Sequence, residues 1–254
     1  MDDFPAWPSS RREILTALAL GGAAAASSAK ARAPIKAIAF DAFVLFNPGM
    51  IARRAAEIVG DEANGLIAAA SAKLFAYTWL YTSASQYAGF EALARDAFSF
   101  AAQTTRVSLS DSELDHLVAG YSALDVWTDV PPALEELRRR GFRLVLLSNL
   151  PQSALGSSLR QNGIAHQFAH VLSTDRVKKF KPAPEAYAMA ISSLRLRRDE
   201  IGFAAFAGWD AAGATWFGYR TAWINRSRAL PEQAHARPAI VSDGMDGVLA
   251  LTRM

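Results

Sequence analysis

Short, largely apolar runs recur along the chain from residue 35 onward, and amphipathic stretches separate them. Such runs predict strands buried on both faces, and apolar residues at helical spacing predict helices between them. Strands that alternate with helices predict a doubly wound α/β fold, a parallel sheet with helices on both faces. The predicted strands are 35–40, 143–147, 170–174, 201–207 and 221–224, the predicted helices are 131–140, 153–161, 182–196 and 210–217, and the tail after 226 is predicted to be loop-rich.

A long Ala-rich segment interrupts this alternation after the first predicted strand. Residues 49–121 hold almost no β-branched runs, and apolar residues such as Leu74, Tyr77 and Leu80 recur at positions that fit helical faces. We therefore predict a Rossmann-like core formed by residues 34–48 and 122–254, with a helical cap formed by residues 49–121 inserted after the first strand.

Composition narrows the classes of function. The chain has 254 residues, of which 51% are hydrophobic and 20% charged, and its formal net charge is +3. It contains no cysteine, which excludes disulfides, thiolate metal sites and a cysteine nucleophile. No cluster of lysine and arginine interleaved with aromatic residues is present, so we expect no nucleic-acid partner.

The N-terminal segment has the features of an export signal. Arg11 and Arg12 stand directly before a mildly apolar stretch, 14–26, and small residues follow at Ala29 and Ala31. This order predicts a twin-arginine signal over residues 1–31, cleavage after Ala31 and a periplasmic protein that uses the export machinery. The apolar stretch is too short for a stable membrane anchor. A cytoplasmic N-terminal extension is the alternative.

Polar residues stand at the ends of four predicted strands, where ligands bind in a doubly wound sheet. Asp41 follows the first strand, Ser148 and Asn149 end the second, and Asp210 follows a later one, while Lys181 stands just before Pro182. Each residue has an ordinary structural alternative. Asp41, Ser148, Asn149 and Asp210 could form turns or cap helices, and Lys181 could be a solvated surface residue. Their combination and order are more specific than any one of them.

Phe43 indicates which chemistry Asp41 can perform. A carboxylate at the tip of a buried strand is a candidate nucleophile. A second acid two residues later would point the same way and could protonate an alkoxide leaving group, but this position holds Phe43. The leaving group must therefore depart without that acid, which a halide does readily.

These residues and their surroundings resemble the haloacid dehalogenase superfamily, and in particular its type II, or (S)-2-haloacid dehalogenase, branch. The resemblance covers nearly everything from residue 35 to residue 226. The stretches that carry it are AIAFDAF (37–43), FAYTWL (75–80), LLSN (146–149), VLSTDRVKKFKPAPEAY (171–187) and FAGWDAAGATWFGY (206–219).

The resemblance implies a catalytic trio. Asp41 matches the nucleophile, which would displace halide from C2 of a short 2-haloalkanoic acid and form an ester. Lys181 matches the lysine that keeps the nucleophile ionised and neutralises the developing oxyanion. Asp210 matches the carboxylate that orients this lysine and the hydrolytic water.

The resemblance also implies how the substrate is held. Ser148 and Asn149 match residues that bind the substrate carboxylate and halide region, and Tyr187 matches a tyrosine that packs into the site. It implies preference for the (S) enantiomer, no metal or cofactor, and a possible homodimer through the apolar 77–80 helix. Four further residues match apolar pocket positions, with core packing as the alternative for each: Phe43, Phe75, Phe90 and Trp209.

The chain departs from the family pattern at three polar supports. Ser71 stands where the family has a cap arginine that binds halide or carboxylate, and Leu45 replaces a threonine. Phe206 and Ala207 stand where a serine and asparagine pair is expected. Lys73 lies about 200° around the helix from Ser71 and cannot replace the arginine. Nothing in the sequence shows whether Arg53 or Arg54 reaches the site.

Two other functions remain open at this point. A phosphatase of the same superfamily would need an acid at position 43 and a further acidic metal ligand, where the chain has Phe43, Ala205 and Phe206. An exported protein that binds a ligand, or acts on another substrate, would explain the lost supports, since a fold does not fix a function. Retention of Asp41, Lys181 and Asp210 together argues against a purely structural role.

Overall fold

Six parallel strands form one sheet at the centre of the protein, in the order β3-β2-β1-β4-β5-β6. The computed structural model describes residues 33–233 and 235–254. The predicted export signal, 1–31, lies outside them. The strands are β1 (Ala37–Phe40), β2 (Arg143–Ser148), β3 (His170–Ser173), β4 (Ile201–Ala205), β5 (Arg220–Ile224) and β6 (Ile240–Ser242).

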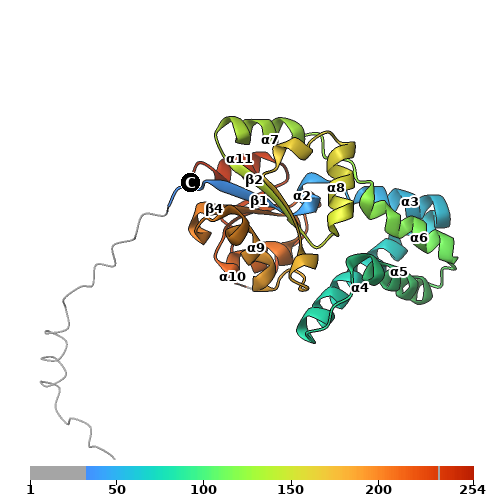
Figure 1. The fold of residues 1–254 in the computed structure, drawn as a ribbon. Coiled ribbons are helices and arrows are strands. Elements are labelled where there is room, and N and C mark those ends of the chain that lie inside the picture. The colour runs from blue at the N-terminus through green and yellow to red at the C-terminus, as the bar shows by residue number, and fades with distance from the viewer. Residues whose placement is uncertain (1–32, 234) are drawn as a thin grey trace, which may run out of the picture. The chain divides into compact units, whose positions relative to one another are not determined.

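Helices cover both faces of the sheet, because alternate residues of each strand point to opposite sides (Figure 1). Ala37 and Ala39 of β1 pack in one apolar cluster, and Ile38 and Phe40 pack in the other. The first cluster includes residues of α9 (Pro184–Leu194) and α10 (Gly208–Phe217); the second includes residues of α7 (Val130–Arg139), α8 (Gln152–Gln161) and α11 (Asp246–Leu251). The predicted doubly wound α/β class is confirmed.

The strand register brings the ends of three strands together. Phe40, the last residue of β1, lies opposite Leu146 of β2 and Ala204 of β4. A single residue, Asp41, separates β1 from the short helix α2 (Ala42–Leu45). The residues that follow these three strands therefore share one edge of the sheet.

Four helices connected in sequence form the cap between β1 and β2 (Figure 1). They are α3 (Gly49–Val59), α4 (Ala63–Ser83), α5 (Phe90–Thr105) and α6 (Asp111–Ala119). Leu66, Ala70 and Leu74 of α4 are buried at four-residue spacing, as expected for one helical face. Away from the linkers, hydrogen bonds also tie the cap to the core: Phe180 N–H donates to Thr82 Oγ1 at 3.1 Å, and Tyr87 Oη donates to the carboxylate of Asp175.

The prediction of a loop-rich tail after residue 226 is wrong in part. β6 pairs with β5, and Val248 and Leu251 of α11 are buried in the core. β6 has only three residues, and the glycines at 244 and 247 give the α11 region the composition of a loop. The helix predicted at 182–196 begins at Pro184 instead, because proline fits the first turn of a helix.

No helix in the described part of the chain is long and apolar enough to cross a membrane.

Candidate active site

Asp41 occupies the position between the end of β1 and the start of α2. It is the N-cap residue of α2, and its Oδ2 accepts a hydrogen bond from Phe43 N–H at 3.0 Å. The capping role considered for this residue is therefore real. The residue is 8% exposed, and it lines a cavity between core and cap. Capping leaves its other oxygen, Oδ1, available for a second partner.

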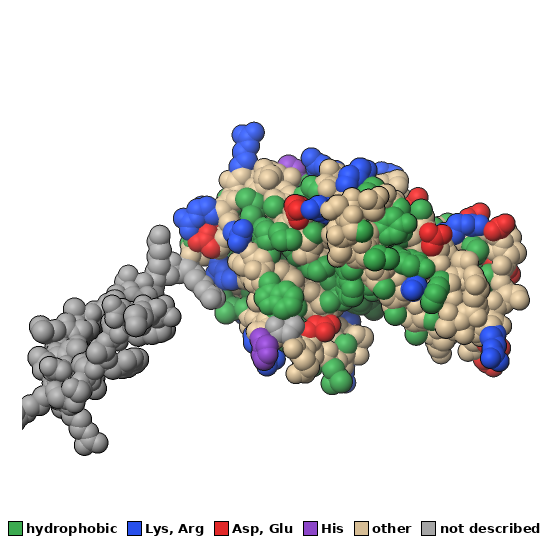
Figure 2. All heavy atoms as spheres, turned by 90° about the horizontal axis from the view of Figure 1, so that it is seen from below, with side chains coloured by type: hydrophobic (Ala, Val, Ile, Leu, Met, Phe, Trp, Pro, Cys, Tyr) green, Lys and Arg blue, Asp and Glu red, His purple; other side chains and the backbone are tan. Residues whose placement is uncertain are grey.

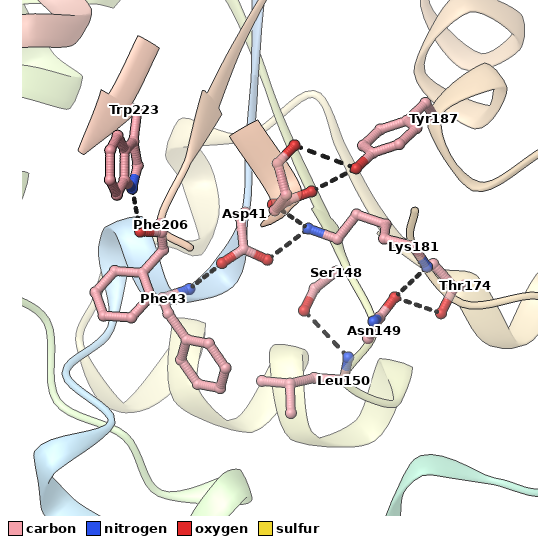
Figure 3. Close-up of polar contacts among 11 residues, drawn as sticks. Asp41, Phe43, Ser148, Asn149, Leu150, Thr174, Lys181, Tyr187, Phe206 and Trp223 are labelled. Atoms are coloured by element: carbon pink, nitrogen blue, oxygen red, sulfur yellow. Dashed lines mark hydrogen bonds and ion pairs between the residues drawn. The ribbon is translucent and has the colours of Figure 1, made fainter. Parts of the chain in front are cut away.

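Lys181 provides that partner (Figure 3). Its Nζ also bonds Asp210. Its Nζ lies 2.6 Å from Asp41 Oδ1 and 2.8 Å from Asp210 Oδ2. The lysine side chain is 1% exposed, so the solvated surface lysine considered as the alternative is wrong. The structure thus brings together three residues that are far apart in the sequence.

The trio carries a net charge of −1 when all three groups are ionised. Burial alone would lower the pKa of Lys181, but the charges and hydrogen bonds of Asp210 and Asp41 outweigh it and raise that pKa above its ordinary value. Burial raises the pKa of Asp210 to about 6, although Lys181 acts in the opposite direction. Near neutral pH Lys181 is therefore cationic, and Asp210 is mostly anionic.

Asp210 is held by Tyr187 as well as by Lys181. Tyr187 Oη donates to Asp210 Oδ1 at 2.7 Å, and the tyrosine is fully buried. Gly213, one turn later on α10, permits this packing, because a Cβ there would lie 2.7 Å from Tyr187 Oη and 2.7 Å from Pro182 Cβ. Asp210 is not the N-cap considered for its helix: α10 begins at Gly208, which places Asp210 inside the first turn.

Asn149 and Ser148 stabilise the loops beneath the trio. Asn149 Oδ1 accepts from Lys181 N–H at 2.9 Å and from Thr174 Oγ1 at 3.4 Å, and Ser148 Oγ accepts from Leu150 N–H at 3.1 Å (Figure 3). Neither residue is among those that line the cavity. Asn149 thus fixes the backbone that carries Lys181, and Ser148 fixes the backbone at Leu150. The expected contact of both residues with the substrate stays a prediction.

The cavity next to Asp41 has a volume of about 340 Å³ and is lined mostly by apolar side chains. Phe43, Phe75 and Phe90 line it as expected, and Phe206 packs edge-to-face on Phe43 with ring centroids 5.9 Å apart. Besides Ser148 and Asn149, two further expected substrate contacts, Tyr187 and Trp209, are not among the lining residues. Trp209 packs against the rings of Phe75 and Trp79, and Tyr187 contacts Asp210.

The cations considered as replacements for the missing arginine point elsewhere. Ser71 lines the cavity, whereas Lys73 Nζ lies over the Phe100 ring, 3.9 Å from its centroid. Arg54 Nη1 donates to the backbone oxygen of His116, and the exposed Arg53 contacts the sulfur of Met50. In the described ranges, therefore, no lysine or arginine lines the cavity.

Several lining residues were not among the predicted site residues, and two of them are large aromatic residues close to the core, Phe206 and Tyr121. Phe206 lies just beyond β4, so its place after a strand could have indicated it. Tyr121 lies in the 3₁₀ turn that leads back from cap to core, Gly120–Ser122, and no local pattern distinguishes it from a packing residue. Within 33–233 and 235–254 there is no group of three histidine or acidic residues that could hold a metal ion.

Comparison with known proteins gives a consistent result. The profile of the haloacid dehalogenase-like hydrolase family matches residues 35–204. The chain is 33% identical to (S)-2-haloacid dehalogenase of Pseudomonas sp. (strain YL), over 80% of this chain and 88% of the relative. It is 34% identical to (S)-2-haloacid dehalogenase 2 of Pseudomonas sp. (strain CBS-3), over 68% and 76% respectively. A crystal structure of an L-2-haloacid dehalogenase is similar with a TM-score of 0.84 and 31% identity, over 87% of this chain and all of that one.

Proposed function

Because the chain belongs to the haloacid dehalogenase-like hydrolases, we propose that it hydrolyses short 2-haloalkanoic acids to 2-hydroxy acids through an ester on Asp41. The observation that carries this proposal is the pair of contacts from Lys181 Nζ to Asp41 and Asp210 beside an apolar cavity. Relatives named as (S)-2-haloacid dehalogenases support the substrate class and the (S) enantiomer.

In the first step, an oxygen of Asp41 attacks C2 of the substrate. A carbon–oxygen bond forms, the carbon–halogen bond breaks, and the halide leaves with the electron pair. The apolar cavity removes water from the carboxylate, which makes it a better nucleophile. No proton is transferred to the leaving group, so Phe43 is compatible with this step.

In the second step, water attacks the carbonyl carbon of the Asp41 ester. The oxyanion develops on the Asp41 oxygen that is not bonded to C2, and the donor that already contacts this oxygen, Lys181 Nζ at Oδ1 or Phe43 N–H at Oδ2, stabilises it. The bond between this carbon and the ester oxygen breaks. One proton of the water ends on the product hydroxyl and the other is released, so that the Asp41 carboxylate is regenerated.

Halide release tests this proposal. Purified protein is incubated with racemic 2-chloropropionate in excess EDTA, beside Asp41→Asn and, as a matched control, Asp243→Asn, which changes an exposed carboxylate. We expect chloride from the wild type and the control, none from Asp41→Asn, and residual (R) substrate. Activity that EDTA abolishes would favour a phosphatase-type metal site, and no chloride from a folded protein would favour the non-catalytic or altered-substrate alternative.

We also propose that residues 1–31 direct export to the periplasm. The support is the Arg11-Arg12 pair before an apolar stretch. In a bacterium with a twin-arginine pathway, the full chain should reach the periplasm, and the double substitution Arg11→Lys and Arg12→Lys should retain it in the cytoplasm. Periplasmic arrival of the double variant would refute this signal.

A homodimer through the cap is a further proposal. Figure 2 shows hydrophobic side chains gathered near the middle of one face of the described residues. Trp79 and Leu80 of α4 and Phe100 of α5 are large hydrophobic residues with exposures of 38%, 60% and 42%. Light scattering should give twice the chain mass for the wild type and a monomer for Leu80→Glu, whereas a monomeric wild type would refute the proposal.

A further inference from the structure

The cavity beside Asp41 contains few polar groups. Of its fifteen lining residues, only Asp41, Ser71 and Tyr121 carry a polar side chain. Asp41 is occupied by Lys181 and by the Phe43 N–H. Among the lining side chains, the two hydroxyl groups, which the cap supplies, are therefore the donors left for the remainder of a substrate.

These two hydroxyls are free to bind a ligand. Neither Ser71 Oγ nor Tyr121 Oη has a hydrogen-bond partner among the described residues. Both oxygens retain some exposed surface, which is consistent with their facing the cavity. The Tyr121 ring is held edge-on against Phe90, with centroids 5.0 Å apart. Burial raises the pKa of Tyr121, so its phenol stays protonated and remains a donor.

Among the described residues, the cavity provides no separate cation for the carboxylate of an acid substrate. Lys181, the cation nearest the nucleophile, is shared by two carboxylates, which leaves the trio with a net charge of −1. No lysine or arginine from the described ranges lines the cavity. A substrate carboxylate would enter an apolar space without a cation of its own, whereas an uncharged acyl group would not suffer this desolvation.

We propose that the hydroxyls of Ser71 and Tyr121 bind the acyl oxygen of the substrate, and that the site therefore accepts uncharged 2-haloacyl compounds, such as 2-haloamides, in addition to the acids. This inference rests on the proposed function, because it uses the same nucleophile and the same displacement of halide. Hydroxyl donors satisfy a neutral carbonyl well, and they hold a carboxylate less well than a guanidinium does.

The test measures kcat/KM for chloride release from 2-chloropropionate and 2-chloropropionamide in four proteins. These are the wild type, Tyr121→Phe, Ser71→Arg and, as a matched control outside the cavity lining, Tyr77→Phe. The ratio of the amide value to the acid value is compared between proteins, so that the intrinsic reactivities of the two substrates cancel.

We expect the wild type to use both substrates. Tyr121→Phe keeps the ring and loses the hydroxyl, so kcat/KM for the amide should fall about three- to ten-fold, as for a lost hydrogen bond, while Tyr77→Phe changes neither value. Ser71→Arg should lower the ratio of amide to acid at least tenfold by improving the acid. An unchanged ratio in both cavity variants, or turnover of the acid alone by the wild type, overturns the inference and leaves the proposed function intact.

Absence of chloride from either substrate would refute the proposed function, and binding then decides the inference separately. Calorimetry of Asp41→Asn with propionamide and propionate should show tighter binding of the amide, and adding Tyr121→Phe should weaken it. Equal binding of both compounds, or no effect of Tyr121→Phe, overturns the inference.

Discussion

Replacing Lys181 by methionine is the strongest test of the ion pairs that join Asp41, Lys181 and Asp210. The side chain keeps its approximate volume, but the two buried carboxylates of Asp41 and Asp210 lose the cation that lies 2.6 and 2.8 Å away. Removing one partner of a buried pair costs about 3–5 kcal/mol, because the remaining charge is uncompensated. Domains of this kind have about 5–15 kcal/mol of stability, so the variant should still fold.

Urea unfolding at about pH 8, followed by tryptophan fluorescence, measures this loss. Lys179→Met is the matched control, because Lys179 Nζ forms an ion pair of similar length, 2.7 Å, with Glu185 at the surface. Such exposed pairs contribute less than about 1 kcal/mol. The double variant Lys181→Met, Asp210→Asn should recover part of the loss, since only one buried carboxylate then remains.

The pH dependence of the variant gives a second readout with a definite sign. Without the lysine, which lowers the pKa of the buried Asp210 carboxyl, that pKa rises further above its unfolded value. Such a group destabilises the native state above the raised pKa, and stability returns as pH falls through it. The deficit of Lys181→Met should therefore shrink between about pH 8 and about pH 5. A loss no larger than that of Lys179→Met, or a deficit independent of pH, would refute this reasoning.

Three further predictions concern Asp210 and its supports. Because its pKa is about 6, the kcat/KM profile for chloride release should fall as pH drops through about 6, where protonation removes the charge that orients Lys181. Tyr187→Phe removes a donor to this carboxylate, so the same acid limb should move to higher pH; an unmoved limb would contradict the assignment. Gly213→Ala places a Cβ against Pro182 and Tyr187, so the free energy of unfolding should fall by about 1–3 kcal/mol, and the melting temperature and kcat/KM should fall with it; an unchanged melting temperature would contradict this.

The fold could largely be predicted from the sequence, because each central strand is buried on both faces and is therefore apolar throughout. β1, β2, β4 and β5 fall within two residues of the predicted runs. β6 and α11 could not be predicted in the same way. β6 is three residues long and has exposed or half-buried side chains, so only its pairing with β5 defines it as a strand.

The charged trio could also be predicted, because parallel strands bring polar residues at their carboxyl ends to one edge of the sheet. Roles that depend on tertiary partners could not. Asn149 binds the backbone of Lys181, and Tyr187 binds Asp210, although both residue types are equally compatible with substrate contact. Tyr121 reaches the cavity from the end of the cap, and only the folded arrangement places it there.

The ester on Asp41 is the central claim, and one isotope measurement tests it most directly. Enzyme in excess over (S)-2-chloropropionate is allowed a single turnover in heavy-oxygen water, and the tryptic peptide of residues 37–53 is analysed by mass spectrometry. The account predicts one heavy oxygen in this peptide, at Asp41, and a lactate product whose hydroxyl oxygen is unlabelled. Heavy oxygen in the lactate with an unlabelled peptide would show direct attack of water on C2 and would contradict the account.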